Sequence, residues 1–159
     1  MFRNLRRTKQ QLTDQETEAL LERGSFGVLA LLGDGDYPYA LPLNYVLAGN
    51  HIYFHSAPAG HKIDAIGAGA KASFCVVEES RVIPEELTTS FSSAIAFGRV
   101  FVVEDEAKRR EALGLICEKY APGLEALKQE AIDSSLHRTA IIGLEIEHRS
   151  GKVSRDKMN

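Results

Sequence analysis

Residues 55–62, HSAPAGHK, bring together chemical groups that can hold a phosphate. Ser56 ends a run that alternates like a strand, a loop of small residues follows, and a His-Lys pair then begins helical spacing. Free amides at a helix N-terminus attract anions, and Lys62 adds a full positive charge. Hydroxyl, loop, helix start and cation together predict a phosphate cradle. Its residues are Ser56, Gly60, His61 and Lys62.

The same stretch also has a plainer interpretation. His61 and Lys62 can be solvated residues in the first turn of a helix, where a cation is mildly unfavourable unless an anion lies nearby. His55 can be an ordinary histidine at a strand end, or a group that transfers protons near neutral pH. The residues alone leave these alternatives open.

Other apparent motifs for cofactor, metal or catalytic chemistry do not meet the structural requirements of that chemistry. Residues 67–72, GAGAKA, match a dinucleotide-binding fingerprint, but here a helix precedes the motif and a strand follows it, the reverse of the required order. His51 and His55 have a metal-like spacing, yet four residues of strand span about 13 Å, too far for two imidazoles to share one ion. No GxSxG nucleophile turn occurs. We therefore expect neither a metal site nor a hydrolase.

The elements that position these residues are mostly strands. A capping box, Thr13-Asp-Gln-Glu16, predicts a first helix that ends near Arg23. Strand-forming residues between turn signals predict strands, and apolar residues at helical spacing predict helices. The strands are expected at 25–32, 37–47, 51–56, 72–77, 92–103 (with a bulge at Gly98) and 139–148, and the helices at 61–66, from 105 to the Pro122-Gly123 stop, and at 124–132.

Two segments need special treatment. Pro42 lies within an expected strand but cannot donate a ladder hydrogen bond, so it needs an edge, a bulge or a neighbour that is not a strand. Residues 78–91 are polar and broken by Pro84, which predicts a long, partly mobile connection. The whole pattern predicts a mainly β fold, an antiparallel barrel with peripheral helices.

Composition narrows the function classes. The chain has 159 residues and a formal net charge of −3, which fits one domain over 1–159 and no nucleic-acid partner. A basic N-terminal arm (1–12) and a short C-terminal tail (149–159) flank this domain; the arm is either a flexible terminus or a clamp for a ligand. Cys75 and Cys117 form no disulfide or zinc pattern, and no signal peptide or membrane-length apolar run is visible. We therefore expect a cytoplasmic protein without a membrane partner.

Three long segments carry a family resemblance. These are GVLALLGDGDYPYALPLNYV, HIYFHSAPAGHKIDAI, and SSAIAFGRVFVVED followed by a helix ending EKYAP. In this order and spacing they resemble the pyridoxamine 5′-phosphate oxidase-like flavoproteins, most closely the nitroimidazole-resistance (Nim-type) branch. The resemblance extends from about Arg6 to about Lys152, and its most specific parts are PLNYV and YFHSAPAGHK.

The resemblance implies a split β-barrel that forms a homodimer, with FMN bound in sites between the subunits. The predicted cradle matches the family's phosphate segment, and the strand from Leu41 to Tyr45 matches the one that runs along the isoalloxazine ring. Pro42 would then face a flavin rather than a strand, and Asn44 would bond the polar edge of the ring. The implied cofactor-binding residues are Leu41, Pro42, Leu43, Asn44, Tyr45, His55, Ser56, Gly60, His61, Lys62, Ser92, Ser93 and, less closely matched, Arg99.

The resemblance also implies an activity. Ser92 and Ser93 would reach the flavin from the second subunit, and His55 matches a histidine near the flavin that we take as the catalytic residue. The C-terminus, HRSGKVSRDKMN, lacks the arginine and histidine pair of the true oxidase, so vitamin B6 oxidation is not expected. The implied function is an FMN-dependent oxidoreductase that passes electrons from a reduced nicotinamide or another donor to a small acceptor, such as a nitroimidazole. The alternatives are a non-catalytic flavin-binding or redox-responsive module, and a haem-binding relative.

Overall fold

The protein is built around one curled antiparallel sheet. The computed structural model describes residues 2–67 and 69–154. Within that part, seven strands pair in the order β2-β1-β5-β6-β7-β4-β3. The strands are β1 (Gly27–Leu32), β2 (Pro38–Leu43), β3 (Val46–Ala48), β4 (His51–Ser56), β5 (Ala70–Ile83), β6 (Thr88–Val102) and β7 (Ala140–Ser154).

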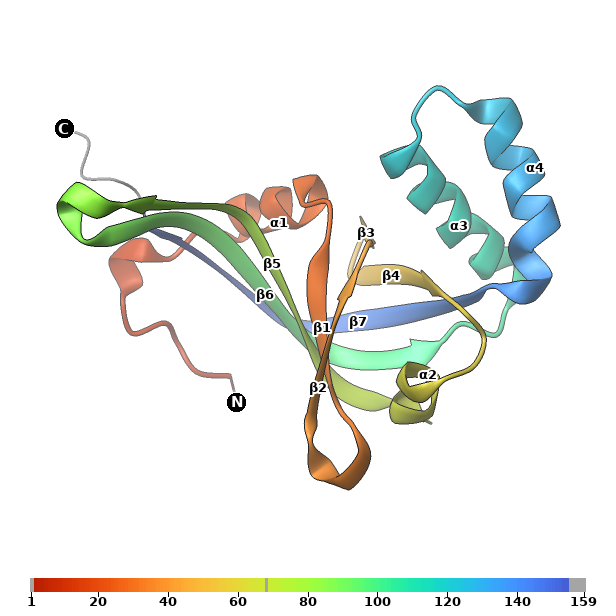
Figure 1. The fold of residues 1–159 in the computed structure, drawn as a ribbon, viewed down its shortest axis with the longest axis horizontal. Coiled ribbons are helices and arrows are strands. Elements are labelled where there is room, and N and C mark those ends of the chain that lie inside the picture. Colours follow the sequence, from red (N-terminus) through yellow and green to blue (C-terminus); the bar gives the residue numbers. More distant parts are fainter. Residues whose placement is uncertain (1, 68, 155–159) are drawn as a thin grey trace.

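The connection between β2 and β3 forces the sheet to curl. These strands are the two edges of the sheet, yet only Asn44 and Tyr45 separate them along the chain. The three steps from Leu43 to Val46 span at most about 10 Å, so the edges must come together; in Figure 1, β2 runs directly into β3. The expected antiparallel split β-barrel with peripheral helices is therefore confirmed. We call the Asn44–Tyr45 step the barrel seam.

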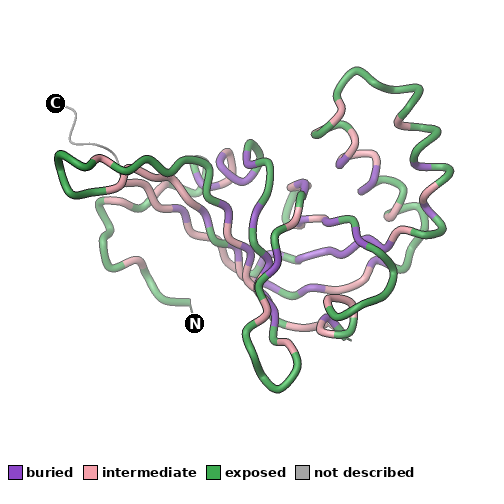
Figure 2. Tube along the Cα trace, viewed as in Figure 1, coloured by how far each residue is buried: buried purple, intermediate pink, exposed green. Residues whose placement is uncertain are grey.

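Two apolar cores stabilise this arrangement. The main core fills the inside of the curl with fully buried side chains such as Leu29, Phe54 and Phe74. A second core, including Ile116 and Ile141, lies between the helical excursion and the outer side of β4 and β7. Figure 2 shows buried residues along the central strands and exposed residues along the projecting parts. The alternation of β1, in which every second residue is buried, follows from the strand period.

Helices cover the ends of the sheet. They are α1 (Asp14–Arg23), α2 (His61–Ile66), α3 (Glu106–Tyr120) and α4 (Glu125–Ser135). The predicted capping box is confirmed, since the Thr13 hydroxyl accepts from the Glu16 amide at 3.2 Å while a Glu16 carboxylate oxygen accepts from the Thr13 amide at 2.9 Å. No helix among the described residues combines the length and the apolar character that a membrane crossing requires.

The predicted mobile connection at 78–91 is wrong. β5 and β6 continue pairing to Ile83 and Thr88, so this segment forms a long two-stranded hairpin arm that projects from the barrel (Figure 1). A short turn at Pro84–Glu86 and a left-handed Leu87 (φ 51°) reverse the chain at its tip. The arm is largely exposed on both faces, so its residues lack the apolar alternation that identifies a half-buried strand.

The chain ends also differ from expectation. The last strand continues to Ser154 rather than ending at His148, so residues 149–154 belong to β7 and residues 155–159 lie outside the described part. The N-terminal arm runs alongside β7, where the Leu12 amide donates to the Gly151 carbonyl at 3.0 Å. A bulge occurs at the level of Gly98, but its extra residue is in the partner strand: the register moves from Phe97–His148 to Gly98–Ile146, which leaves Glu147 of β7 unpaired in the ladder.

Candidate functional site

The residues of the predicted cradle lie at the step from β4 to α2. Ser56 is the last residue of β4 and is buried, and its hydroxyl donates to the Ala57 carbonyl at 2.9 Å. Gly60 precedes α2 with φ 115°, a backbone conformation that residues with a side chain rarely adopt. No side chain among the described residues caps the N-terminus of α2. These features leave room for an anion at the position that the sequence indicated.

The His61 and Lys62 side chains of the cradle are held differently. The His61 ring stacks on Tyr39, with centroids 4.2 Å apart, and its Nε2 lies 3.7 Å from an Asp34 carboxylate oxygen. His61 is therefore fixed against the β1–β2 hairpin. Lys62 is half-buried and makes neither an ion pair nor a hydrogen bond within residues 2–67 and 69–154. Lys62 is consequently the charge that an incoming anion can neutralise.

His55 does not share a side of the strand with Ser56. Successive residues of a strand point to opposite faces, so His55 lies on the outer side of β4 while Ser56 points into the curl. The His55 side chain is exposed and pairs in register with Ile141 of β7. Tyr53, on the same side, packs into the second core against α3. The structure thus places His55 beside the cradle in sequence but on the opposite face.

The strand from Leu41 to Tyr45 divides into two faces. Leu41 and Leu43 point toward the main core, whereas Pro42 and Asn44 are exposed on the outer side. Pro42 lies on an edge strand, one of the positions that the sequence required. The Tyr45 side chain is fully buried and its hydroxyl donates to the Leu21 carbonyl at 2.6 Å. Burial raises the pKa of Tyr45, and its ring is directed into the core and away from any outer-face ligand.

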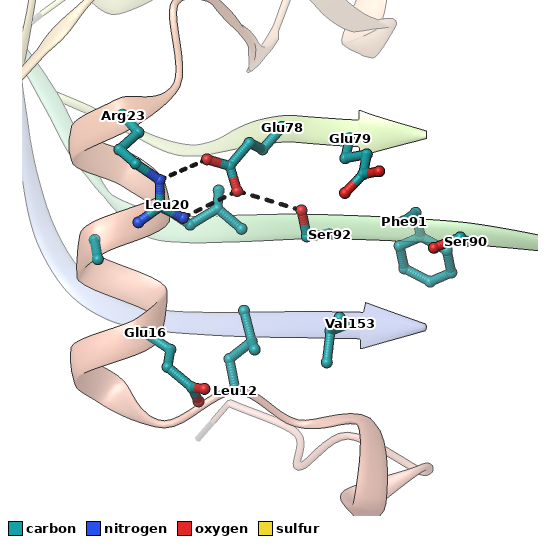
Figure 3. Close-up of a pocket in the computed structure, with 11 residues that line it drawn as sticks. Leu12, Glu16, Leu20, Arg23, Glu78, Glu79, Ser90, Phe91, Ser92 and Val153 are labelled. Carbon is teal, nitrogen blue, oxygen red and sulfur yellow. Dashed lines mark hydrogen bonds and ion pairs between the residues drawn. The ribbon is translucent and has the colours of Figure 1, made fainter. Parts of the chain in front are cut away.

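Ser92 and Ser93 also point to opposite faces. The Ser92 hydroxyl donates to Glu78 at 3.3 Å, and Arg23 of α1 holds the same carboxylate through Nε and Nη2 at 2.7 and 3.1 Å (Figure 3). The guanidinium of Arg23 lowers the pKa of Glu78. These residues line a cavity of about 430 Å³ between α1 and the base of the arm. Sequence reasoning missed the Arg23–Glu78 pair, because nothing local relates residues 55 positions apart.

The outer face of the sheet is apolar where the central strands meet. Val28, Cys75 and Ile95 are direct cross-strand neighbours, and Val28 and Ile95 are each 36% exposed. Ser93 lies on this face, opposite Val77. Directly opposite residues of a sheet share one face, so these side chains form one continuous surface. We call this surface, with Pro42 opposite Val28, the outer apolar face.

Two predicted residues lie away from the cradle within one chain. Ser93 is at the base of the hairpin arm, which projects on the left in Figure 1, whereas α2 lies in the lower right part of the molecule. Arg99 is exposed and its Nε lies 3.2 Å from a Glu147 carboxylate oxygen. The structure therefore brings together Ser56, Gly60, His61 and Lys62, and it leaves Ser92 and Ser93 apart from them. Arg99 lies further along β6, where it pairs in register with Lys71 at the start of β5.

Tyr120 is a residue that sequence reasoning did not single out. Its hydroxyl lies within hydrogen-bond distance of three backbone groups of Ser25 and Tyr45, next to Asn44. A signal was present, since Tyr120 belongs to the EKYAP ending of α3 that contributes to the family resemblance. Its role depends on a contact across 75 residues of sequence, which no local pattern reveals.

Solved structures with the same fold include flavin-binding proteins. The FAD and heme binding protein from Mycobacterium smegmatis is 25% identical, with a TM-score of 0.79 over 92% of this chain and 74% of that chain. The flavocytochrome Anf3 from Azotobacter vinelandii is 22% identical, with a TM-score of 0.79 over 96% and 73%. A candidate 5-nitroimidazole antibiotic resistance protein from Bacteroides thetaiotaomicron is 20% identical, with a TM-score of 0.75 over 90% and 86%.

The sequence itself gives the family. No curated protein sequence matches the chain. The family model described as pyridoxamine 5′-phosphate oxidase matches residues 13–153, which include every strand of the barrel up to Val153 in β7. The chain therefore belongs to the pyridoxamine 5′-phosphate oxidase family.

Proposed function

We propose that the protein is an FMN-binding flavoprotein that acts as a homodimeric oxidoreductase. The observation that carries the proposal is the cradle, in which an uncapped helix start, the positive-φ Gly60 and the unpaired Lys62 lie beside the buried Ser56. This set fits a phosphate group, because the cation and the helix amides both favour a dianion. Flavin binding by the M. smegmatis protein of the same fold supports the proposal.

In this proposal the flavin ring extends from the cradle along the outer side of β2. Pro42 and Asn44 are the outward residues there, while Leu41, Leu43 and Tyr45 contribute backbone groups and support from the core. The ring can lie against Pro42 because β2 is an edge strand without a further β partner. Bound flavin supplies the electron transfer, and the chain's residues bind and orient it.

A second copy of the chain completes the site. The cradle residues and Ser93 lie far apart in one chain, and Ser93 lies on the outer apolar face. Burial of apolar area drives association, so pairing of two outer faces would bring Ser93 of one copy toward the cradle of the other. Arg99 is exposed on the same side. Ser92 is the weaker candidate, since Glu78 already accepts its hydroxyl hydrogen.

The proposed reaction passes electrons from a reduced nicotinamide to a small acceptor such as a nitroimidazole. The similarity in fold to the candidate nitroimidazole resistance protein supports this acceptor class.

His55 would donate a proton to the reduced acceptor. The control is His137→Gln, since His137 is exposed and lies outside β4. If His55→Gln leaves turnover unchanged with every acceptor, as His137→Gln should, His55 has no catalytic role. Cys75 and Cys117 are both free, which suits a cytoplasmic location.

The alternatives are a flavin-binding module without turnover and a haem-binding protein. The haem alternative is favoured by two structures of this fold, the M. smegmatis FAD and heme binding protein and the A. vinelandii flavocytochrome. Titration of the purified protein with FMN, FAD and haem, followed by visible absorbance, separates these cases. The proposal expects FMN uptake, bleaching by a reduced nicotinamide without oxygen, and recovery of colour on adding a nitroimidazole. A protein that takes up no flavin contradicts the proposal, and one that binds FMN without bleaching is a module.

A further inference from the structure

The barrel seam has backbone groups without a strand partner. The β1–β2 ladder ends at the pair Gly27 and Leu43, and the β3–β4 ladder begins at Val46 and Tyr53. Tyr45 lies between these ladders and is fully buried. Buried backbone amides and carbonyls need hydrogen-bond partners. The seam therefore requires a group from elsewhere in the fold.

Tyr120, the last residue of α3, supplies that group. Its hydroxyl oxygen accepts a hydrogen bond from the Tyr45 amide at 2.9 Å and lies 2.8 Å from the Tyr45 carbonyl oxygen. It also lies 2.6 Å from the Ser25 carbonyl oxygen. A phenol has one hydrogen to donate, so it can serve only one of the two carbonyls at a time.

Asn44 supplies a hydrogen bond to the Ser25 carbonyl, which leaves the Tyr120 hydrogen for the Tyr45 carbonyl. Its side-chain nitrogen donates to the Ser25 carbonyl at 2.9 Å. Because a carbonyl oxygen can only accept, this contact fixes which end of the amide is the nitrogen. The Asn44 side-chain oxygen is therefore turned away from Ser25. Asn44 is exposed on the outer side of β2, so this oxygen is available as an acceptor there.

Lys119 also contacts the barrel seam. Its ammonium nitrogen lies 4.0 Å from the centroid of the Tyr45 ring and 5.6 Å from that of Tyr120. This nitrogen is buried and has no hydrogen-bond partner among the described residues. A cation over an aromatic face is attracted to the ring, so Lys119 holds the end of α3 against the seam. The Tyr45 hydroxyl, bonded to Leu21, anchors the other end of that ring.

We propose that Tyr120 is a positioning residue of the ligand site: by closing the barrel seam it holds Asn44 with its side-chain oxygen outward, as an acceptor for an imide N–H. The ligand group that this acceptor recognises is a ring N–H flanked by two carbonyls, which is the N3 position of an isoalloxazine. This inference rests on the proposed flavin function. It adds that the site recognises the N3–H of the ring through a hydrogen bond to Asn44, and that Tyr120 of α3 orients Asn44 for this bond.

The experiment compares FMN with 3-methyl-FMN, which lacks the imide hydrogen. We expect the wild-type protein to bind FMN about tenfold more tightly than 3-methyl-FMN, the usual effect of one lost hydrogen bond. Tyr120→Phe should bring the two affinities to within about twofold and shift the visible spectrum of bound FMN. Asn44→Ala, with Tyr120 intact, should abolish the discrimination in the same way. Circular dichroism verifies the fold of each variant.

Tyr37→Phe is the matched control, since Tyr37 is 77% exposed and outside the seam. This variant should discriminate between the two flavins as the wild type does. Equal wild-type affinities for FMN and 3-methyl-FMN overturn the inference and leave the flavin function intact. A Tyr120→Phe protein that folds and keeps the tenfold discrimination also overturns it. If the wild type binds neither flavin, the proposed function fails and the inference fails with it.

Discussion

At the scale of single residues, the proposed anion binding at the step from β4 to α2 depends most on Lys62. It is the cation of the cradle without a partner in the described residues, whereas His61 is stacked on Tyr39. Lys62→Ala should weaken FMN binding about 10- to 100-fold, because hydrogen bonds to charged groups are the stronger ones. Riboflavin, which lacks the phosphate, should lose less than threefold. Quenching of flavin fluorescence measures both affinities.

The control for this prediction is Lys108→Ala. Lys108 is an exposed residue of α3 outside the proposed site, so its loss should change neither affinity. If Lys62→Ala weakens FMN and riboflavin binding equally, Lys62 does not contact the phosphate. The sequence could group Lys62 with Ser56 and Gly60, because strand end, loop and helix start are consecutive in the chain. It could not show that His61 is held by Asp34, since that contact depends on the β1–β2 hairpin.

Lys119 gives a prediction about pH. Burial lowers its pKa from an ordinary value of 10.5 to about 8. Between pH 8 and 10.5 the unfolded chain therefore binds more protons here than the folded chain, so the free energy of unfolding should rise with pH across this window. Below pH 8 both states are protonated and the contribution is constant. Urea denaturation of wild type and Lys119→Met at pH 7.0 and 9.5 measures the effect as a difference between the two proteins.

In Lys119→Met the free energy of unfolding should not rise with pH across this window. Measurements stop below pH 10, since the unfolded chain loses tyrosine protons there while the buried Tyr45, whose pKa is raised, keeps its own. If the two proteins show the same pH dependence, the attraction of the Tyr45 ring for the ammonium offsets the desolvation. Lys119 would then be protonated throughout, and the lowered pKa would be wrong.

At the scale of elements, Gly98 sets how closely β6 approaches β7. A Cβ atom at this position would lie 1.8 Å from the Glu145 carbonyl oxygen, a backbone atom that no rotamer change can move. Gly98→Ala should therefore lower the free energy of unfolding by about 3 kcal/mol or more. Gly114→Ala is the control, because nothing lies within 4 Å of its Cβ position in α3. This change should raise stability by about 0.5–1 kcal/mol, and thermal melts compare the two.

If Gly98→Ala is as stable as the wild type, the bulge does not bring the two backbones as close as described. The level of the bulge was predictable, since a glycine inside a strand pattern usually marks one. That its extra residue, Glu147, belongs to β7 was not, because this depends on the pairing of β6 with β7. The hairpin arm was not predictable in the same way. Glu78 and Glu79 begin a stretch with solvent on both faces, so its strands depend on pairing with each other rather than on an apolar pattern. Pro84 marked the turn of this arm, not a loose connection.

At the scale of the whole molecule, chain order determines the barrel, and the proposed site depends on the proposed dimer. The curl follows from one topological fact, that the two edge strands are joined by Asn44 and Tyr45. Hairpin signals in the sequence were sufficient to predict an antiparallel barrel. The strand period does place Ser92 and Ser93 on opposite faces. The hairpin signals could not show which of the two lies on the outer apolar face, because the extra residue Glu78 changes the register of β5 against β6. Only Ser93 lies where a second copy would meet it.

The outer apolar face makes the dimer testable. Ile95 lies in its middle, beside Cys75, and is 36% exposed in one chain. Ile95→Glu places a charge that pairing of two copies would bury without a partner, which is costly. We expect this variant to elute as a monomer, with its mass confirmed by light scattering. It should also lose FMN binding, because the proposed site draws on both copies.

Leu127→Glu is the matched control for this change. Leu127 is 60% exposed on α4, away from the outer apolar face, so the same charge there should leave both the dimer and FMN affinity unchanged. A monomeric Ile95→Glu protein that binds FMN as tightly as the wild type would mean that each chain holds its own flavin, and Ser93 would then have no role in the partner's site. A variant that stays dimeric would place the contact between copies on another surface.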